Sequence, residues 1–129
     1  MAKDGHGRFH WNELLTNDVE GAQAFYGELM GWNYDAMNMP EGTVYHVATK
    51  GGEPVAGIMK MPETVPTGTP PHWMSYVEVD DIDARLKTAK AAGATVLMEP
   101  FEVEGTGRIA MLQDPTGAVI GWITPDVAG

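Results

Sequence analysis

Apolar positions along the chain change spacing at Asp18 and again at Asp81. Residues 9–16 form an extended, largely apolar run, which predicts a strand. From Asp18 the apolar residues recur every three or four positions up to Gly31, as on one face of a helix. An aspartate can cap the first free helix amides, and a glycine is a common cap at the other end. We therefore expect a helix over residues 18–30.

Three short strands and a proline-rich segment are expected after this helix. Apolar runs separated by turn residues predict strands at 32–39, 43–49 and 54–61. Residues 62–71 then contain four prolines and a glycine, which favour neither a strand nor a helix. We interpret this segment as a linker that ends a first βαβββ module at about residues 8–61.

The same pattern starts again after the linker. Residues 72–79 read as a strand, and a helix is expected over 81–92. Three more strands are predicted at 94–101, 108–113 and 118–124. The second module, at about residues 72–125, therefore repeats the order of the first. Neither module can cover its own sheet, so we expect the two to pack together as one α+β domain over 1–129.

Charge and cysteine content narrow the classes of function. Eight basic and eighteen acidic residues give a formal charge of −10, and the basic residues are scattered, which argues against nucleic acid as a partner. The chain has no cysteine, so disulfides and thiolate metal sites are excluded. We find no signal peptide and no apolar run of membrane-spanning length, and we expect a cytoplasmic protein that does not bind membranes.

Short motifs recur around the two predicted helices. They are Asp18-Val19-Glu20, Ala24-Phe25-Tyr26 and Gly31-Trp32 in the first half, and Val79-Asp80-Asp81-Ile82-Asp83-Ala84, Ala91-Ala92-Gly93-Ala94 and Asp114-Pro115-Thr116-Gly117 in the second. Together they resemble the vicinal-oxygen-chelate superfamily, which includes glyoxalase I, extradiol dioxygenases, and fosfomycin- and bleomycin-resistance proteins. The resemblance implies paired βαβββ modules whose curved mixed sheet cups a central cavity, with a divalent metal at its floor in many members.

The resemblance also implies four metal-ligand positions, and none of them carries a suitable donor in this chain. Those positions fall on Trp11, Met74 and Gly121, and near Gly57. Magnesium, manganese and iron of this type need carboxylate or imidazole ligands, which an indole, a thioether and glycines cannot replace. We therefore expect no metal cofactor. A displaced divalent-metal site formed by His46, His72 and Glu13 is the alternative.

Strand alternation places Trp11 and Glu13 on one face of the first strand. By the repeat, His72, Met74 and Tyr76 share the equivalent face of the second module, so Glu13 is expected within hydrogen-bond reach of Tyr76. A carboxylate inside an apolar strand needs a partner, a raised pKa or access to water. Glu13 is thus either a polar anchor for a ligand, with Tyr76 as its acid–base partner, or a structural carboxylate.

Apolar side chains are expected to line the same cavity. They are Trp11, Met59, Met74, Tyr76 and Met111. Such residues suit a flat organic molecule, or they fill the space that a metal would take. Gly57 and Gly121 either leave room for a ligand or allow strands to approach closely. His46, in the middle of a strand, is a further candidate ligand-binding residue.

Three functions are consistent with these features. The first is a metal-free protein that binds a small organic molecule, as bleomycin-resistance proteins do. The second is a glyoxalase-like lyase, isomerase or dioxygenase that uses a displaced metal or the pair Glu13 and Tyr76. The third is an accessory protein that acts through oligomerisation. The modules can pair within one chain or swap between the chains of a homodimer, and the sequence does not choose between the two.

Overall fold

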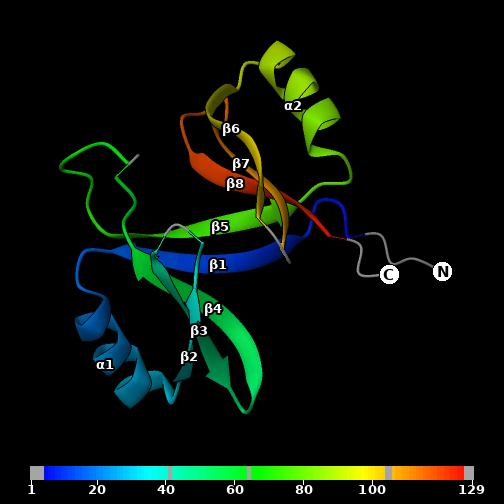
Figure 1. The fold of residues 1–129 in the computed structure, drawn as a ribbon. Coiled ribbons are helices and arrows are strands. Elements are labelled where there is room, and N and C mark those ends of the chain that lie inside the picture. The colour runs from blue at the N-terminus through cyan, green and yellow to red at the C-terminus, as the bar shows by residue number, and fades with distance from the viewer. Residues whose placement is uncertain (1–4, 41, 64, 104–105, 127–129) are drawn as a thin grey trace. The chain divides into compact units, whose positions relative to one another are not determined.

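The computed structural model describes residues 5–40, 42–63, 65–103 and 106–126, and it contains the βαβββ order twice (Figure 1). The elements are β1 (Phe9–Thr16), α1 (Val19–Met30), β2 (Asn33–Asn38), β3 (Val44–Lys50), β4 (Glu53–Lys60), β5 (His72–Glu78), α2 (Ile82–Ala91), β6 (Thr95–Val103), β7 (Gly107–Gln113) and β8 (Val119–Pro125). The predicted α+β class and order of elements are confirmed. The expected linker and turns include residues 41, 64 and 104–105, which lie outside the described residues.

Both helices begin where the aspartates predict. Asp18 Oδ1 accepts a hydrogen bond from the Gly21 N–H at 2.9 Å, and Asp81 Oδ1 accepts one from the Ala84 N–H at 3.2 Å. At the end of α1, Gly31 has a φ of 74°, a left-handed conformation that favours glycine. In the described part of the chain, no helix has the length and apolar character needed to cross a membrane.

The chain forms two compact units that divide after His10 and after Met74. Residues 11–74, the first unit, contain strands in the order β2-β3-β4-β1. The β2/β3 and β3/β4 pairs are antiparallel, whereas β4 and β1 run parallel. This register places Gly57 of β4 opposite Glu13 of β1.

The sheet of the first unit has two different faces. Leu14, Ala48 and Ile58 are buried on one of them. The Tyr34 hydroxyl on this same face donates to the Gln23 carbonyl of α1 at 2.9 Å, so this is the face that α1 covers. Glu13 lies on the opposite face, because successive strand residues alternate in direction. The candidate site is built on that opposite face.

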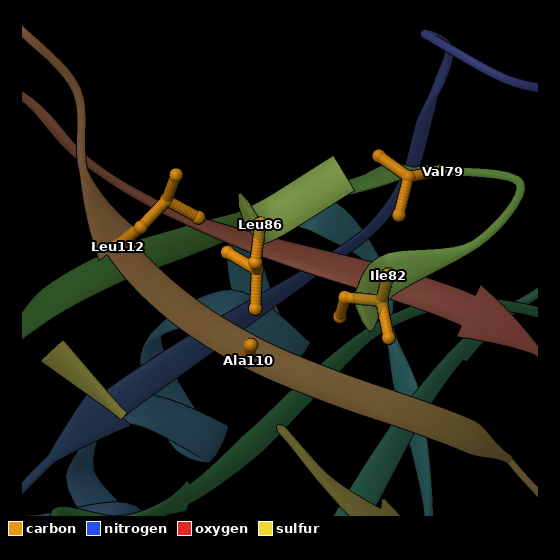
Figure 2. Close-up of a cluster of buried hydrophobic side chains, with 5 residues drawn as sticks. All are labelled: Val79, Ile82, Leu86, Ala110 and Leu112. Atoms are coloured by element: carbon orange, nitrogen blue, oxygen red, sulfur yellow. The ribbon is translucent and has the colours of Figure 1, made fainter. Parts of the chain in front are cut away.

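The second unit holds β8, β7, β6 and the part of β5 from Ser75 onward, in the order β5-β8-β7-β6. Its core is a cluster of buried aliphatic side chains from α2, from β7 and from the segment before α2 (Figure 2). The cluster consists of Val79, Ile82, Leu86, Ala110 and Leu112. Residues just before β1 also belong to this unit, since the Gly7 N–H donates to the Glu78 carbonyl at 2.8 Å. Burial of these apolar side chains stabilises the unit around α2.

Candidate functional site

A chain of three hydrogen-bonded side chains lies on the face of the first unit's sheet that is opposite to α1. The Trp11 Nε1–H of β1 donates to the Tyr45 hydroxyl of β3 at 2.7 Å. The Tyr45 hydroxyl donates in turn to Glu13 Oε1 at 3.0 Å. An indole N–H can only donate, so the phenol oxygen accepts from Trp11 and its single proton is directed at Glu13. The direction of the whole chain is therefore fixed.

Burial determines the protonation state of Tyr45. The side chain is partly buried, and Glu13, only 8 % exposed, lies beside it. Burial raises the pKa of Tyr45 well above its ordinary range, and the negative charge of Glu13 raises it further. The hydrogen bond from Trp11 acts in the opposite direction and is the smaller effect. Tyr45 is thus a neutral donor at physiological pH, and Glu13 is the acceptor at the end of the chain.

Gly57 makes this arrangement possible. A Cβ at this position would overlap the hydroxyl and ring of Tyr45. The space left by the missing side chain is therefore occupied by the phenol, which reaches across β4 to Glu13. The second unit has a similar arrangement of a tyrosine ring beside a glycine. A Cβ at Gly121 would overlap the Tyr76 ring, and Tyr76 and Gly121 are register partners.

The positions that the resemblance assigns to metal ligands do not fit a metal. The Trp11 N–H is directed at Tyr45, and phenol rings fill the space beside Gly57 and Gly121. Met74 contributes a thioether that is 5 % exposed. None of these groups is a usual ligand of a hard divalent cation. Among the residues that the structure describes, no three or more histidine, aspartate or glutamate side chains are placed to hold a metal together.

The structure does not bring His46 and His72 to Glu13. His46 is the register partner of Ile58, so it lies on the face that α1 covers. His72 is one of the residues that line a groove of about 430 Å³, together with Leu14, Phe25 and Trp73. His72 Nδ1 is 2.9 Å from the Pro70 carbonyl oxygen. Among the residues that the structure describes, these two histidines and Glu13 do not form a group placed to hold a metal.

The groove is bordered by a group of aromatic side chains. The Trp73 Nε1–H donates to the Tyr26 hydroxyl at 3.2 Å, and the Tyr26 and Trp32 rings stack with centroids 5.2 Å apart. Trp73 meets both rings nearly at right angles. These edge-to-face contacts are favourable for aromatic rings and attach the start of β5 to α1. Their first role is therefore packing.

The other predicted site residues fall into both units. Met59 is the register partner of Leu15, which places it on the Glu13 face. Tyr76, 4 % exposed, and Met111 belong to the second unit, where Gly121 is the register partner of each. Glu13 and Tyr76 thus stand in different units, and their proximity stays a prediction.

Tyr45 is the residue that sequence analysis missed. The candidate named from the sequence was its neighbour His46. The alternation of β3 directs Tyr45, and not His46, to the Glu13 face. The available signal was the glycine at position 57, which leaves room for one large side chain from an adjacent strand.

The paired βαβββ units define the class of this protein, and comparison with known families agrees. The family model of the Glyoxalase/Bleomycin resistance protein/Dioxygenase superfamily matches residues 8–121. The chain therefore belongs to this superfamily, which confirms the resemblance inferred from the sequence motifs.

Two kinds of relative match most of this chain. It is 42 % identical over 113 residues to a Mycobacterium tuberculosis protein named "Putative glyoxylase CFP32". This alignment covers 87 % of this chain and 43 % of the relative. The chain is 31 % identical over 129 residues to the anthracycline biosynthesis protein DnrV of Streptomyces peucetius, with coverage of 92 % and 47 %. The chain thus spans about half the length of these relatives.

Solved structures share the fold at low sequence identity. Methylmalonyl-CoA epimerase from Mycobacterium tuberculosis superposes with a TM-score of 0.68 at 15 % identity, over 98 % of this chain and 93 % of the epimerase. A Streptomyces coelicolor methylmalonyl-CoA epimerase in complex with 2-nitronate-propionyl-CoA gives 0.67 at 18 % identity, over 95 % and 99 %. At these identities the likeness concerns the fold.

Replacing Gly57 by alanine should displace the Tyr45 phenol, because the new Cβ overlaps its hydroxyl. We expect Gly57→Ala to lower the free energy of unfolding by about 1–3 kcal/mol through steric overlap and lost hydrogen bonds. In a Tyr45→Ala background the same substitution should cost much less. Gly27→Ala is the control, since its Cβ would stay 3.4 Å from the nearest atom and alanine favours the helix. Urea unfolding of the four variants measures these differences, and equal costs in both backgrounds would contradict the contact.

The raised pKa of Tyr45 predicts a loss of stability in alkali. Above pH 10, the ordinary pKa of tyrosine, the unfolded chain releases the phenol proton while the folded protein retains it. The unfolded state is therefore favoured progressively as the pH rises. Between pH 8 and pH 11 we expect wild type to lose about 1 kcal/mol more than Tyr45→Phe. Urea unfolding at both pH values measures this, and equal losses would show that Tyr45 titrates normally.

Proposed function

We propose that this chain binds a small organic molecule on the Glu13 face, without the divalent metal that many members of the superfamily use. The observation that supports this is the hydrogen-bond chain from Trp11 through Tyr45 to Glu13, which occupies implied metal-ligand positions with groups that do not ligate. In place of a metal, the face offers an oriented carboxylate. A carboxylate accepts more than one hydrogen bond, so Glu13 can accept from Tyr45 and from a ligand.

Each member of the chain has a separate task in this proposal. Glu13 is the polar anchor that accepts a hydrogen bond from the ligand. Tyr45 holds Glu13 Oε1 in one position, and Trp11 holds Tyr45. Met59, an adaptable thioether on the same face, supplies apolar contact. Such a site combines an apolar lining with one precisely placed polar group, which is typical of small-molecule sites.

Metal content and binding test this proposal together. Protein purified without chelator should contain far less than one metal ion per chain by elemental analysis. Native mass spectrometry, and thermal shift against CoA thioesters and anthracyclines, should reveal an organic ligand. Glu13→Gln keeps the shape and removes the charge, so affinity should fall while the free energy of unfolding changes by less than about 2 kcal/mol. One metal per chain would overturn the proposal. A large loss of stability with unchanged binding would show that Glu13 is structural.

A second candidate function is proton transfer by a glyoxalase-like lyase or isomerase, with Glu13 as general base. It is favoured by the fixed orientation of the Glu13 carboxylate, since a base must be held towards the proton that it removes. Methylmalonyl-CoA, named for a structural neighbour, is a suitable first probe. In deuterium oxide, wild type should then exchange the C2 proton at least about tenfold faster than Glu13→Gln. Equal rates would remove this candidate and leave the binding function.

A further inference from the structure

The Glu13 face of the first unit carries acidic and apolar side chains. Register places Asp35 opposite Val47, Val47 opposite Gly57, and Gly57 opposite Glu13, so these four positions share one face. The same alternation adds Trp11, Leu15, Met37, Tyr45 and Met59. These eight side chains and one glycine include two carboxylates, and none of them is lysine, arginine or histidine.

Glu13 and Asp35 differ in their surroundings. Asp35 is exposed, whereas Glu13 is 8 % exposed. The Tyr45 proton is directed at Glu13, and the Trp11 proton is directed at Tyr45. Both of these protons are therefore already used in hydrogen bonds between Trp11, Tyr45 and Glu13. At the Glu13 carboxylate, the group that a ligand can most favourably add is a further hydrogen-bond donor.

We propose that the ligand of this site presents a hydroxyl or a protonated amine to Glu13 and an apolar ring to Trp11 and Met59. This inference rests on the proposed function and specifies the chemical class of the ligand. A carboxylate or phosphate in the same place would stand next to a buried negative charge, where the two would repel. A donor instead forms a charge-assisted hydrogen bond with Glu13, which is stronger than a neutral one. The site thus selects ligands by the polar group they carry.

Four naphthalene probes that differ only in their polar group test this selection. They are 2-naphthol, a neutral donor; 2-naphthylmethylamine, a cationic donor at pH 7; 2-naphthoate, an anion; and 2-methoxynaphthalene, which has no donor. Dissociation constants are measured by ligand-observed NMR with the full chain. The naphthol and the amine should bind at least about tenfold more tightly than the naphthoate and the ether, as expected for one charge-assisted hydrogen bond.

Two variants locate the selection at Glu13. Glu13→Gln should weaken the amine about tenfold and strengthen the naphthoate, because it removes the charge and keeps the shape. Glu28→Gln, which removes one charge from an exposed position on α1, should leave all four affinities within about twofold. If Glu13→Gln does not fold, the order of the four probes on wild type decides the question.

The possible failures can be separated. Tightest binding of the naphthoate, or equal binding of all four probes, overturns the donor requirement and leaves a protein that binds organic molecules. Absence of binding by all four probes also overturns it. One metal ion per chain in elemental analysis overturns the proposed function itself.

Discussion

A carboxylate inside an apolar strand is the constraint on which the first unit depends. Glu13 is nearly buried, and an ionised group in such a place must be hydrogen-bonded to be tolerated. Tyr45 meets this need from β3, two strands away, across β4. The phenol can cross β4 only because residue 57 has no side chain. One polar requirement on β1 thus restricts the residues allowed on β4, its neighbour, and on β3, the strand beyond it.

Sequence reasoning predicted the elements well because their signals are local. Asp18 and Asp81 start helices through hydrogen bonds to amides three residues ahead, and such signals are readable from spacing alone. The position of Tyr45 is a different case. Alternation gives the two faces of a strand, but it does not say which strands are neighbours or in what register. Sequence reasoning therefore placed Glu13 correctly on a face and named Gly57, yet it could not join them to Tyr45.

The two glycines show how a protein interior responds when a ligating side chain is absent. Interiors are densely packed, and an empty volume costs dispersion contacts. In each unit a tyrosine ring takes the space beside a glycine: Tyr45 beside Gly57, and Tyr76 beside Gly121. The expectation that these glycines either admit a ligand or permit close strand approach was thus incomplete, because sequence alone does not show which neighbouring side chain is long enough to use the space.

The one-way hydrogen-bond chain also limits the routes that a proton can take. Trp11 keeps its indole proton, so a proton that reaches Glu13 cannot leave through Tyr45 and Trp11 as it could along a relay of groups that both accept and donate. This path ends at the indole. In the second candidate function, a proton that Glu13 takes from a ligand must therefore leave by a route other than Tyr45 and Trp11. On this side of the carboxylate, Tyr45 and Trp11 give such a proton no path into the rest of the protein.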